Sequence, residues 1–272
     1  MAIPIQMKFL HNERRLYESR SRWGVVQVYE KRDRRELRFG NNVVQSAQSL
    51  AAPHTLLFEY IRAMMSGLLV CPKARHMLHL GLGAGSLPRF IHRYCPDVRQ
   101  RIIEINPSVI EVAYRFFDLP VSSRLLVSES EGREYLDANQ DTYDLIFVDA
   151  FTAEGASDGL DAPGFIRSLD RHLSRGGWVV NNIWGSDLDY LNRIARLMIS
   201  KFTTLFSIPV RSHTNVILIG GQTMNPPQAS LLMKRAVKLS ERLPMDFTVW
   251  PRRMKPYRPE RNEMAPKLIA KA

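Results

Sequence analysis

Cysteine is scarce in this sequence of 272 residues, and long apolar runs are absent from it. The two cysteines, Cys71 and Cys95, lack the spacing of a zinc site or a redox motif, so we expect buried thiols in a reducing compartment. No stretch approaches the roughly twenty apolar residues that span a bilayer, and the N-terminal residues lack the apolar segment of a secretory signal. These absences predict a soluble cytoplasmic enzyme.

The residue patterns of metal-dependent and serine-dependent hydrolases are also missing. None of the seven histidines forms a pair at i and i+4 with a supporting acid, and no serine lies in a nucleophile elbow. We therefore expect no metal. His79 falls inside an apolar segment and is expected to be a packed core histidine. His54 lies near the expected mouth of the site and is a candidate substrate contact.

The formal net charge of +11 is concentrated at the two ends of the chain. Residues 1–40 hold ten Lys or Arg against five Asp or Glu, and residues 234–272 hold eleven against four. The part between them is close to neutral. We interpret the basic ends as solvated surfaces, with contact to an acidic partner as the alternative. No recognition-helix or zinc-finger pattern supports sequence-specific DNA binding.

Short apolar runs alternate with segments of helical periodicity through the middle of the chain. This alternation predicts a doubly wound parallel α/β sheet. The expected strands are at about 77–81, 101–105, 124–128, 144–149 and 177–183. The expected helices are at about 85–95, 107–117, 132–138, 162–174 and 187–200, with Gly176 and Gly177 ending the fourth. Two further β-rich runs, 203–209 and 214–220, predict a closing hairpin. The hairpin favours the Rossmann-like, seven-stranded sheet of S-adenosylmethionine-dependent methyltransferases over that of a dehydrogenase.

Three parts of the chain are expected. Residues 1–50 should form a small antiparallel β appendage, because residues 23–44 alternate as short half-buried strands around a charged turn. Residues 51–225 should form the Rossmann-like catalytic domain, entered by a helix from Pro53 to Leu69. Residues 226–272 should form a basic amphipathic helix at 229–243 and then, beyond Pro244, a loosely ordered tail.

A glycine turn follows the first expected strand of this sheet. Gly81, Gly83 and Gly85 permit a tight turn and a close approach of the backbone to a ligand. Glu104 follows about twenty residues later, at the tip of the second strand, where a carboxylate can accept both hydroxyls of a ribose. This spacing predicts a bound nucleoside.

Acids also follow the third and fourth strands, at the sheet edge where ligands bind in open α/β folds. Glu131, followed by Gly132, could accept the exocyclic amine of an adenine, or could be a solvated loop residue. Asp149 ends the almost wholly apolar run from Tyr143, where a charge is costly without a partner. It is either a cap on the next turn or a group that orients and deprotonates an amine nucleophile.

Several segments together resemble the spermidine synthase (polyamine aminopropyltransferase) family over roughly residues 22–222. They are the β-rich segment ending near Gln45, Gly81-Leu-Gly-Ala-Gly85, Ile103-Glu104-Ile105, Glu131-Gly-Arg-Glu-Tyr-Leu136 and Tyr143-Asp-Leu-Ile-Phe-Val-Asp149. The resemblance implies decarboxylated S-adenosylmethionine as donor, an amine such as putrescine as acceptor, and methylthioadenosine as by-product. It also implies Asp149 as catalytic acid/base, Glu104 on the ribose, Glu131 near the adenine, Gln45 near the donor, and a homodimer.

The chain departs from the family pattern at groups that hold the polyamine. Ala84 stands where the glycine turn usually carries an aspartate, and Thr152 stands where a second aspartate usually follows the catalytic one. Residues 58–60 only approximate the tyrosine-histidine-glutamate cluster of the family. Thr152 remains a candidate substrate contact. Glu154, with Asp158 and Asp161, could supply substitute negative charge or form a solvated acidic loop.

Two other functions remain open from the sequence. One is a methyltransferase that uses intact S-adenosylmethionine on the same sheet. The absence of a basic residue in the glycine turn speaks against it, because the donor's carboxylate would lack a cation. The other is a non-catalytic nucleoside-binding protein whose basic ends contact an acidic partner.

Overall fold

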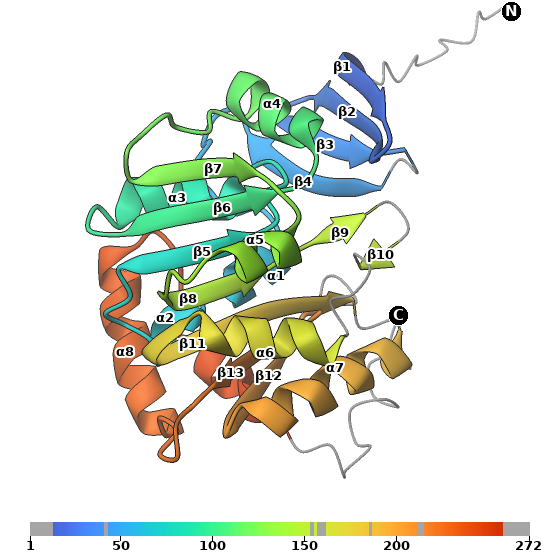
Figure 1. The fold of residues 1–272 in the computed structure, drawn as a ribbon. Helices are drawn as coiled ribbons and strands as arrows, with labels where there is room; N and C mark the ends of the chain where they lie inside the picture. Colours follow the sequence, from blue (N-terminus) through green and yellow to red (C-terminus); the bar gives the residue numbers. More distant parts are fainter. Residues whose placement is uncertain are drawn as a thin grey trace, which may run out of the picture.

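Eight strands form the central sheet, in the order β14, β12, β13, β11, β8, β5, β6 and β7 (Figure 1). Their bounds are β5 (His76–Leu80), β6 (Arg99–Glu104), β7 (Leu125–Glu129), β8 (Tyr143–Val148), β11 (Leu173–Trp184), β12 (Thr204–Pro209), β13 (Asn215–Gly221) and β14 (Lys255–Pro256). The strands from β11 to β7 run parallel, and β13 and β12 close the sheet as an antiparallel hairpin. The predicted fold class is confirmed, with β14 as an additional edge strand.

The computed structural model describes residues 13–40, 43–152, 155–156, 162–184, 187–211 and 215–257, with the backbone alone at 151–152 and 155–156. From β5 the chain proceeds outward to β6 and β7, and it then returns to place β8 and β11 on the other side of β5. The carboxyl ends of β5 and β8 therefore meet where the strand order reverses. Open α/β sheets bind their ligands at this point.

Helices cover both faces of the sheet. Their bounds are α1 (Glu59–Met64), α2 (Gly67–Val70), α3 (Ser86–Tyr94), α4 (Pro107–Phe116), α5 (Gly132–Ala138), α6 (Pro163–Arg171), α7 (Leu188–Lys201), α8 (Ala229–Arg242) and α9 (Trp250–Arg253). One buried cluster joins α1, α2, α3 and α8 to the sheet, and another joins α5, α6 and α7 to its opposite face. No helix in the described part is long and apolar enough to cross a bilayer.

The N-terminal residues form a separate four-stranded antiparallel sheet beside α4, drawn in blue in Figure 1. Its strands are β1 (Glu13–Ser21), β2 (Gly24–Lys31), β3 (Arg34–Phe39) and β4 (Val44–Ser49). Val26, Val28 and Leu37 alternate with polar residues and pack against Val109 and Val112 of α4. The sequence pattern indicated the middle strands, whereas the more polar β1 has no clear alternation to reveal it.

The prediction of one helix from Pro53 to Leu69 is wrong at the start and in the middle of that range. Residues 51–58 form bends and turns, and the helical residues divide into α1 and α2. The guanidinium group of Arg62 donates to the carbonyl oxygens of Leu56 and Leu57, both at 2.7 Å. Arg89 likewise donates to the carbonyl of Pro53. These side chains occupy carbonyls that a continuous helix would use for its own hydrogen bonds.

The expected end of the helix at 162–174 is also corrected. The helix α6 ends at Arg171, and Gly176 and Gly177 lie inside β11, where the pairing with β8 shifts register between Leu173 and Trp178. A Cβ at Gly177 would lie 2.9 Å from the carbonyl oxygen of Tyr143. Glycine at this position therefore allows two backbones to approach at a bulge.

The segment after Pro244 is more ordered than the sequence predicted, up to residue 257. Phe247, Trp250 and Met254 are buried against the same face of the sheet as α8. Arg253 donates to Glu59 Oε1 at 2.5 Å, which ties α9 to α1. This stretch is rich in proline and arginine, so its three regularly spaced apolar residues are easily overlooked in the sequence. Burial of these three side chains fixes the position of the segment.

Phe247→Ala tests whether this segment stabilises the whole fold. The side chain has no exposed surface, so its removal leaves a cavity and should lower the free energy of unfolding by about 3 to 5 kcal/mol. Urea unfolding followed by far-UV circular dichroism measures the change. Val249→Ala is the control, because Val249 is 42% exposed and its truncation should cost little. Equal small effects of both substitutions would contradict a structural role for the segment.

Candidate active site

A cavity of ≈ 510 Å³ lies at the carboxyl ends of the strands. Residues at or just beyond the ends of four parallel strands line it, namely Gly81, Glu104, Glu131 and Asp149, together with Asn182 near the end of β11. Gln45 and Ser46 of β4 also line it, as do Trp23 and Phe39. The N-terminal sheet thus forms one wall of the cavity.

The glycine turn between β5 and α3 lies against the tip of β8. Gly81, Gly83 and Gly85 all have positive φ angles, of 100°, 54° and 67°. A Cβ on Gly81 would lie 2.2 Å from the carbonyl oxygen of Asp149, a separation that no side chain tolerates. Glycine at position 81 therefore allows the turn and the end of β8 to meet. Gly81 and Gly83 line the cavity, whereas Gly85 is the N-cap of α3 and lies outside it.

Glu104 holds the glycine turn to the end of β6. Its Oε2 accepts the backbone N–H of Leu82 at 3.0 Å, and its Oε1 accepts that of Asn106 at 2.9 Å. Burial raises the pKa of Glu104, while these backbone N–H groups and that of Ile105 act to lower it. The two carboxylate oxygens offer about four lone pairs, more than these N–H groups use, so the fixed carboxylate can still accept a ribose hydroxyl.

Glu131 caps α5 and lines the same cavity. Its Oε2 accepts the backbone N–H of Glu134 at 2.9 Å, an N-cap contact that satisfies one of the helix's free donors. Gly132 packs beside Leu80, and a Cβ at Gly132 would lie 3.7 Å from Leu80 Cδ2. The cap fixes where the carboxylate of Glu131 lies and leaves its second oxygen for a ligand.

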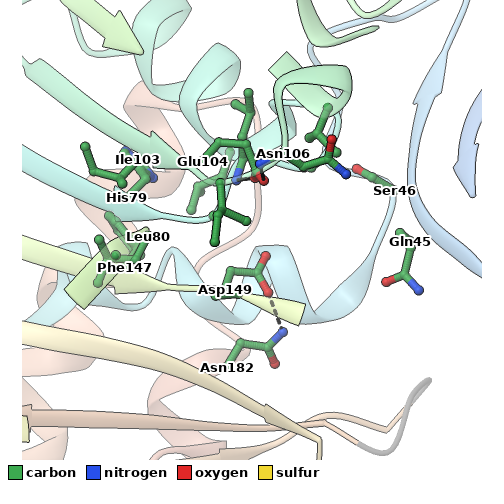
Figure 2. A pocket seen from close by; sticks show the side chains of 18 of the residues that line it. Gln45, Ser46, His79, Leu80, Ile103, Glu104, Asn106, Phe147, Asp149 and Asn182 are labelled. Atoms are coloured by element: carbon green, nitrogen blue, oxygen red, sulfur yellow. Dashed lines mark hydrogen bonds between the residues drawn. The ribbon is translucent and has the colours of Figure 1, made fainter. Parts of the chain in front are cut away.

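In the view of Figure 2, Asp149 lies between Glu104 and Asn182. Its backbone carbonyl meets the glycine turn at Gly81. Asn182 donates its amide N–H to Asp149 Oδ1 at 2.8 Å. Burial raises the pKa of Asp149 to about 6, and the hydrogen bond from Asn182 acts in the opposite direction. Burial, and after it the charge of nearby Asp149, raises the pKa of Tyr60 of α1. A carboxyl group of this kind can change protonation state near neutral pH.

Asn182, Asn215 and Tyr60 line the cavity but were missed from the sequence. Asn215 of β13 donates to Asn182 Oδ1 at 2.9 Å. Asn182 thus links Asn215 to Asp149 through two hydrogen bonds. The sequence held one signal for this group: the two adjacent asparagines, Asn181 and Asn182, interrupt an otherwise apolar strand. Such residues need partners when buried.

Gln45 lies at the right of Figure 2, apart from Asp149 and Asn182. Tyr60 donates its hydroxyl to the backbone carbonyl of Gln45 at 3.4 Å, so α1 and β4 meet at this wall. His79, at the base of the cavity, is 2% exposed and stacks on Phe147 at 5.1 Å between ring centroids. Burial lowers the pKa of His79 to about 3, and the histidine therefore adds no positive charge.

The expected substrate contact of His54 is not supported, because His54 is not among the residues that line the cavity. Its ring packs edge-on against Tyr94 of α3, at 6.2 Å between centroids. Burial, with the charge of Arg89 next in importance, lowers the pKa of His54. The non-helical path of residues 51–58 turns the side chain toward α3 instead.

The remaining sequence candidates are placed only in part. Thr152 belongs to β9 (Phe151–Thr152), which pairs with β10 (Gly155–Ala156), and only its backbone is described. Glu154, Asp158 and Asp161 lie outside the described residues. Ala84 is fully buried and packs in the core beside α4, away from the cavity lining. The methyl group of Ala84 thus takes no part in shaping the cavity.

Comparison with known proteins decides the family, although no family model matches the chain. The chain is 36% identical to a polyamine aminopropyltransferase of Neisseria meningitidis over 241 residues, which cover 87% of this chain and 91% of that protein. It is 34% identical to the polyamine aminopropyltransferase of Chromobacterium violaceum, over 85% of this chain and 89% of that protein. The chain belongs to the polyamine aminopropyltransferase family.

The fold of this aminopropyltransferase chain is shared with solved structures of two kinds. A probable spermidine synthase from Corynebacterium glutamicum has a TM-score of 0.70 and 22% identity, over 81% of this chain and 86% of that one. Human methyltransferase-like protein 13, in complex with SAH, has a TM-score of 0.63 and 23% identity, over 69% of this chain and 93% of that one. The predicted family resemblance is confirmed by the two aminopropyltransferase relatives, and both solved structures share the fold.

Gly81→Ala tests the contact between the glycine turn and β8. The added Cβ must push the turn away from Asp149, so we expect weaker binding of methylthioadenosine, by roughly tenfold or more. Calorimetric titration measures the affinity. Gly176→Ala is a matched control, since Gly176 also has a positive φ, of 79°, but a Cβ there meets nothing within 4 Å. Equal affinities of the two variants would show that the close approach does not matter.

Asp149→Asn should stabilise the protein at alkaline pH. The pKa of Asp149 rises from an ordinary 3.8 to about 6 on folding, so the buried charge opposes folding by up to about 3 kcal/mol above pH 6. The neutral variant loses this penalty at pH 8, and its advantage should vanish near pH 4, where both proteins are uncharged at this position. Thermal unfolding across pH measures the difference. Asp141→Asn, in the exposed loop before β8, should show none.

Proposed function

We propose that this chain transfers an aminopropyl group from decarboxylated S-adenosylmethionine to an amine acceptor and releases methylthioadenosine. Family membership supports the reaction class. The observation that carries the proposal is Asp149, a carboxyl group with a pKa of about 6 between a nucleoside-binding edge and an amide-lined end of one cavity.

The β6 and β7 side of the cavity suits the nucleoside of the donor. Glu104 is fixed by two backbone N–H groups and would accept the ribose hydroxyls. Glu131, fixed as a helix cap, would accept the adenine amine, and Gly81, Gly83 and Gly132 let the ligand approach the backbone. Gln45 would contact the donor from β4.

The charge of the cavity favours a decarboxylated donor. Its described lining residues include the acids Glu104, Glu131 and Asp149 but neither lysine nor arginine. A carboxylate in the donor would enter this cavity without a cation to pair with, which is unfavourable in a partly buried site. A donor that ends in an ammonium group has no such cost.

The chemistry requires a free amine lone pair. An alkylamine with a pKa near 10 is mostly protonated at neutral pH, so Asp149 must first accept its proton. The nitrogen then forms a bond to the carbon next to the sulfonium, the carbon–sulfur bond breaks, and the sulfur leaves as a neutral thioether. A general base of this kind contributes about 10² to 10⁴ in rate.

The acceptor is proposed to be a small amine or polyamine, as the names of the relatives suggest. The family resemblance further suggests a cytoplasmic homodimer. A methyltransferase remains the second candidate, since human methyltransferase-like protein 13 shares the fold. The absence of a cation among the described lining residues argues against it.

An assay for methylthioadenosine tests the proposal. Purified protein is incubated with decarboxylated S-adenosylmethionine and a panel of mono-, di- and triamines, and we expect product with at least one amine. Asp149→Asn should reduce kcat by about 10² or more, whereas Asp141→Asn should leave it unchanged. The activity of the unsubstituted protein should fall as the pH drops through about 6, because Asp149 becomes protonated.

Calorimetric titration with the intact and the decarboxylated donor provides the control for donor choice. Tighter binding of intact S-adenosylmethionine, with methyl transfer to an amine, would favour the methyltransferase. Failure to release methylthioadenosine with any amine, or full activity of Asp149→Asn, would remove the proposed mechanism.

A further inference from the structure

We infer that Asn215 is a positioning residue that acts through Asn182 to orient Asp149 and to set how readily Asp149 takes up a proton. The activity part of this inference depends on the proposed function. Asn215 lies on β13, outside the parallel strands whose tips carry the acids of the cavity. Through Asn215, the hydrogen-bonded side chains that include Asp149 reach the antiparallel hairpin of β12 and β13.

The three side chains form a short hydrogen-bonded chain across neighbouring strands. Asn215 donates Nδ2–H to Asn182 Oδ1 at 2.9 Å, and Asn182 donates Nδ2–H to Asp149 Oδ1 at 2.8 Å. The antiparallel register pairs Asn215 with Trp184, two residues beyond Asn182 on β11, which brings the two amides diagonally together. Asn182 is only 5% exposed, so water cannot readily replace these partners.

The direction of the chain follows from the chemistry of an amide. An asparagine side chain has a donor end and an acceptor end, and rotation by half a turn exchanges them. Because Asn215 donates to the oxygen of Asn182, the NH₂ group of Asn182 faces Asp149. Without that donor, Asn182 could turn its oxygen toward the carboxylate, where the two oxygens would repel.

This arrangement leaves Asp149 with one occupied and one available oxygen. Oδ1 accepts from Asn182, and no described residue donates to Oδ2. The donor is a neutral amide and not a cation, so Asp149 is oriented without losing its ability to accept a proton. A lysine or arginine at position 182 would hold the carboxyl group as a permanent anion and weaken it as a base.

Other titratable groups at the cavity lie on different elements. Tyr60 is on α1, His79 on β5, Glu104 at the end of β6 and Glu131 at the start of α5. Tyr60 and His79 are neutral at physiological pH, because burial raises the pKa of the first and lowers that of the second. None of the four has a hydrogen bond to Asn215, so a substitution at position 215 acts on Asp149 through Asn182.

The test compares Asn215→Leu with Asn215→Gln. Leucine has nearly the shape of asparagine without its donor, whereas glutamine keeps an amide that can reach Asn182. In Asn215→Leu the acid limb of the pH profile of kcat/KM should move upward by roughly 0.5 to 1 pH unit. This corresponds to a two- to fivefold loss at pH 6, with little change at pH 9. Asn215→Gln should restore much of the profile.

A second measurement does not need turnover. The difference in thermal stability between the protein and its Asp149→Asn form, followed across pH, reports the pKa of Asp149 in the unliganded protein. The same difference measured in the Asn215→Leu background should show its midpoint at a higher pH. Asn225→Ala, in the exposed loop after β13, is the control and should shift neither readout.

The outcomes separate this inference from the proposed function. Absence of turnover in all forms would refute the function, while the stability measurement would still decide the role of Asn215. An equal loss of activity at every pH, with an unchanged midpoint in the stability measurement, would show that Asn215 is merely structural and would overturn the inference.

Discussion

The cavity depends on the contact between the glycine turn and the end of β8. Gly81 brings its backbone so close to the carbonyl of Asp149 that any side chain there would collide with it. Glu104 fixes the other side of the same turn by accepting the N–H of Leu82. The tips of β5, β6 and β8 are thereby held together, and the carboxyl groups of Glu104 and Asp149 are held at a fixed separation in one cavity.

Much of the parallel sheet could be predicted because its signals are local. Buried parallel strands appear as short apolar runs, and Pro107 and the glycine turn mark where helices begin. The errors arose where long-range contacts override local preference. Arg62 and Arg89 capture carbonyls before α1, and the sheet accepts Phe247 from a segment whose composition suggested disorder.

One rule accounts for the part of the cavity lining that could be predicted from the sequence. Residues at the carboxyl ends of parallel strands converge, and that rule brought Glu104, Glu131 and Asp149 together. The asparagines required the register between β11 and β13, which no local pattern encodes. His54 lies outside the cavity lining for a related reason: its position depends on the path of a loop and not on a strand end.

The tie between Arg253 and Glu59 has a consequence for the order of folding. Glu59 begins the helix that carries Tyr60, and Arg253 belongs to nearly the last described segment of the chain. A nascent chain on the ribosome can pair β5, β6 and β8 long before that segment emerges, since synthesis proceeds at about 5 to 20 residues per second. The cavity wall formed by α1 would become fixed only after the sheet, so binding competence should appear late in synthesis.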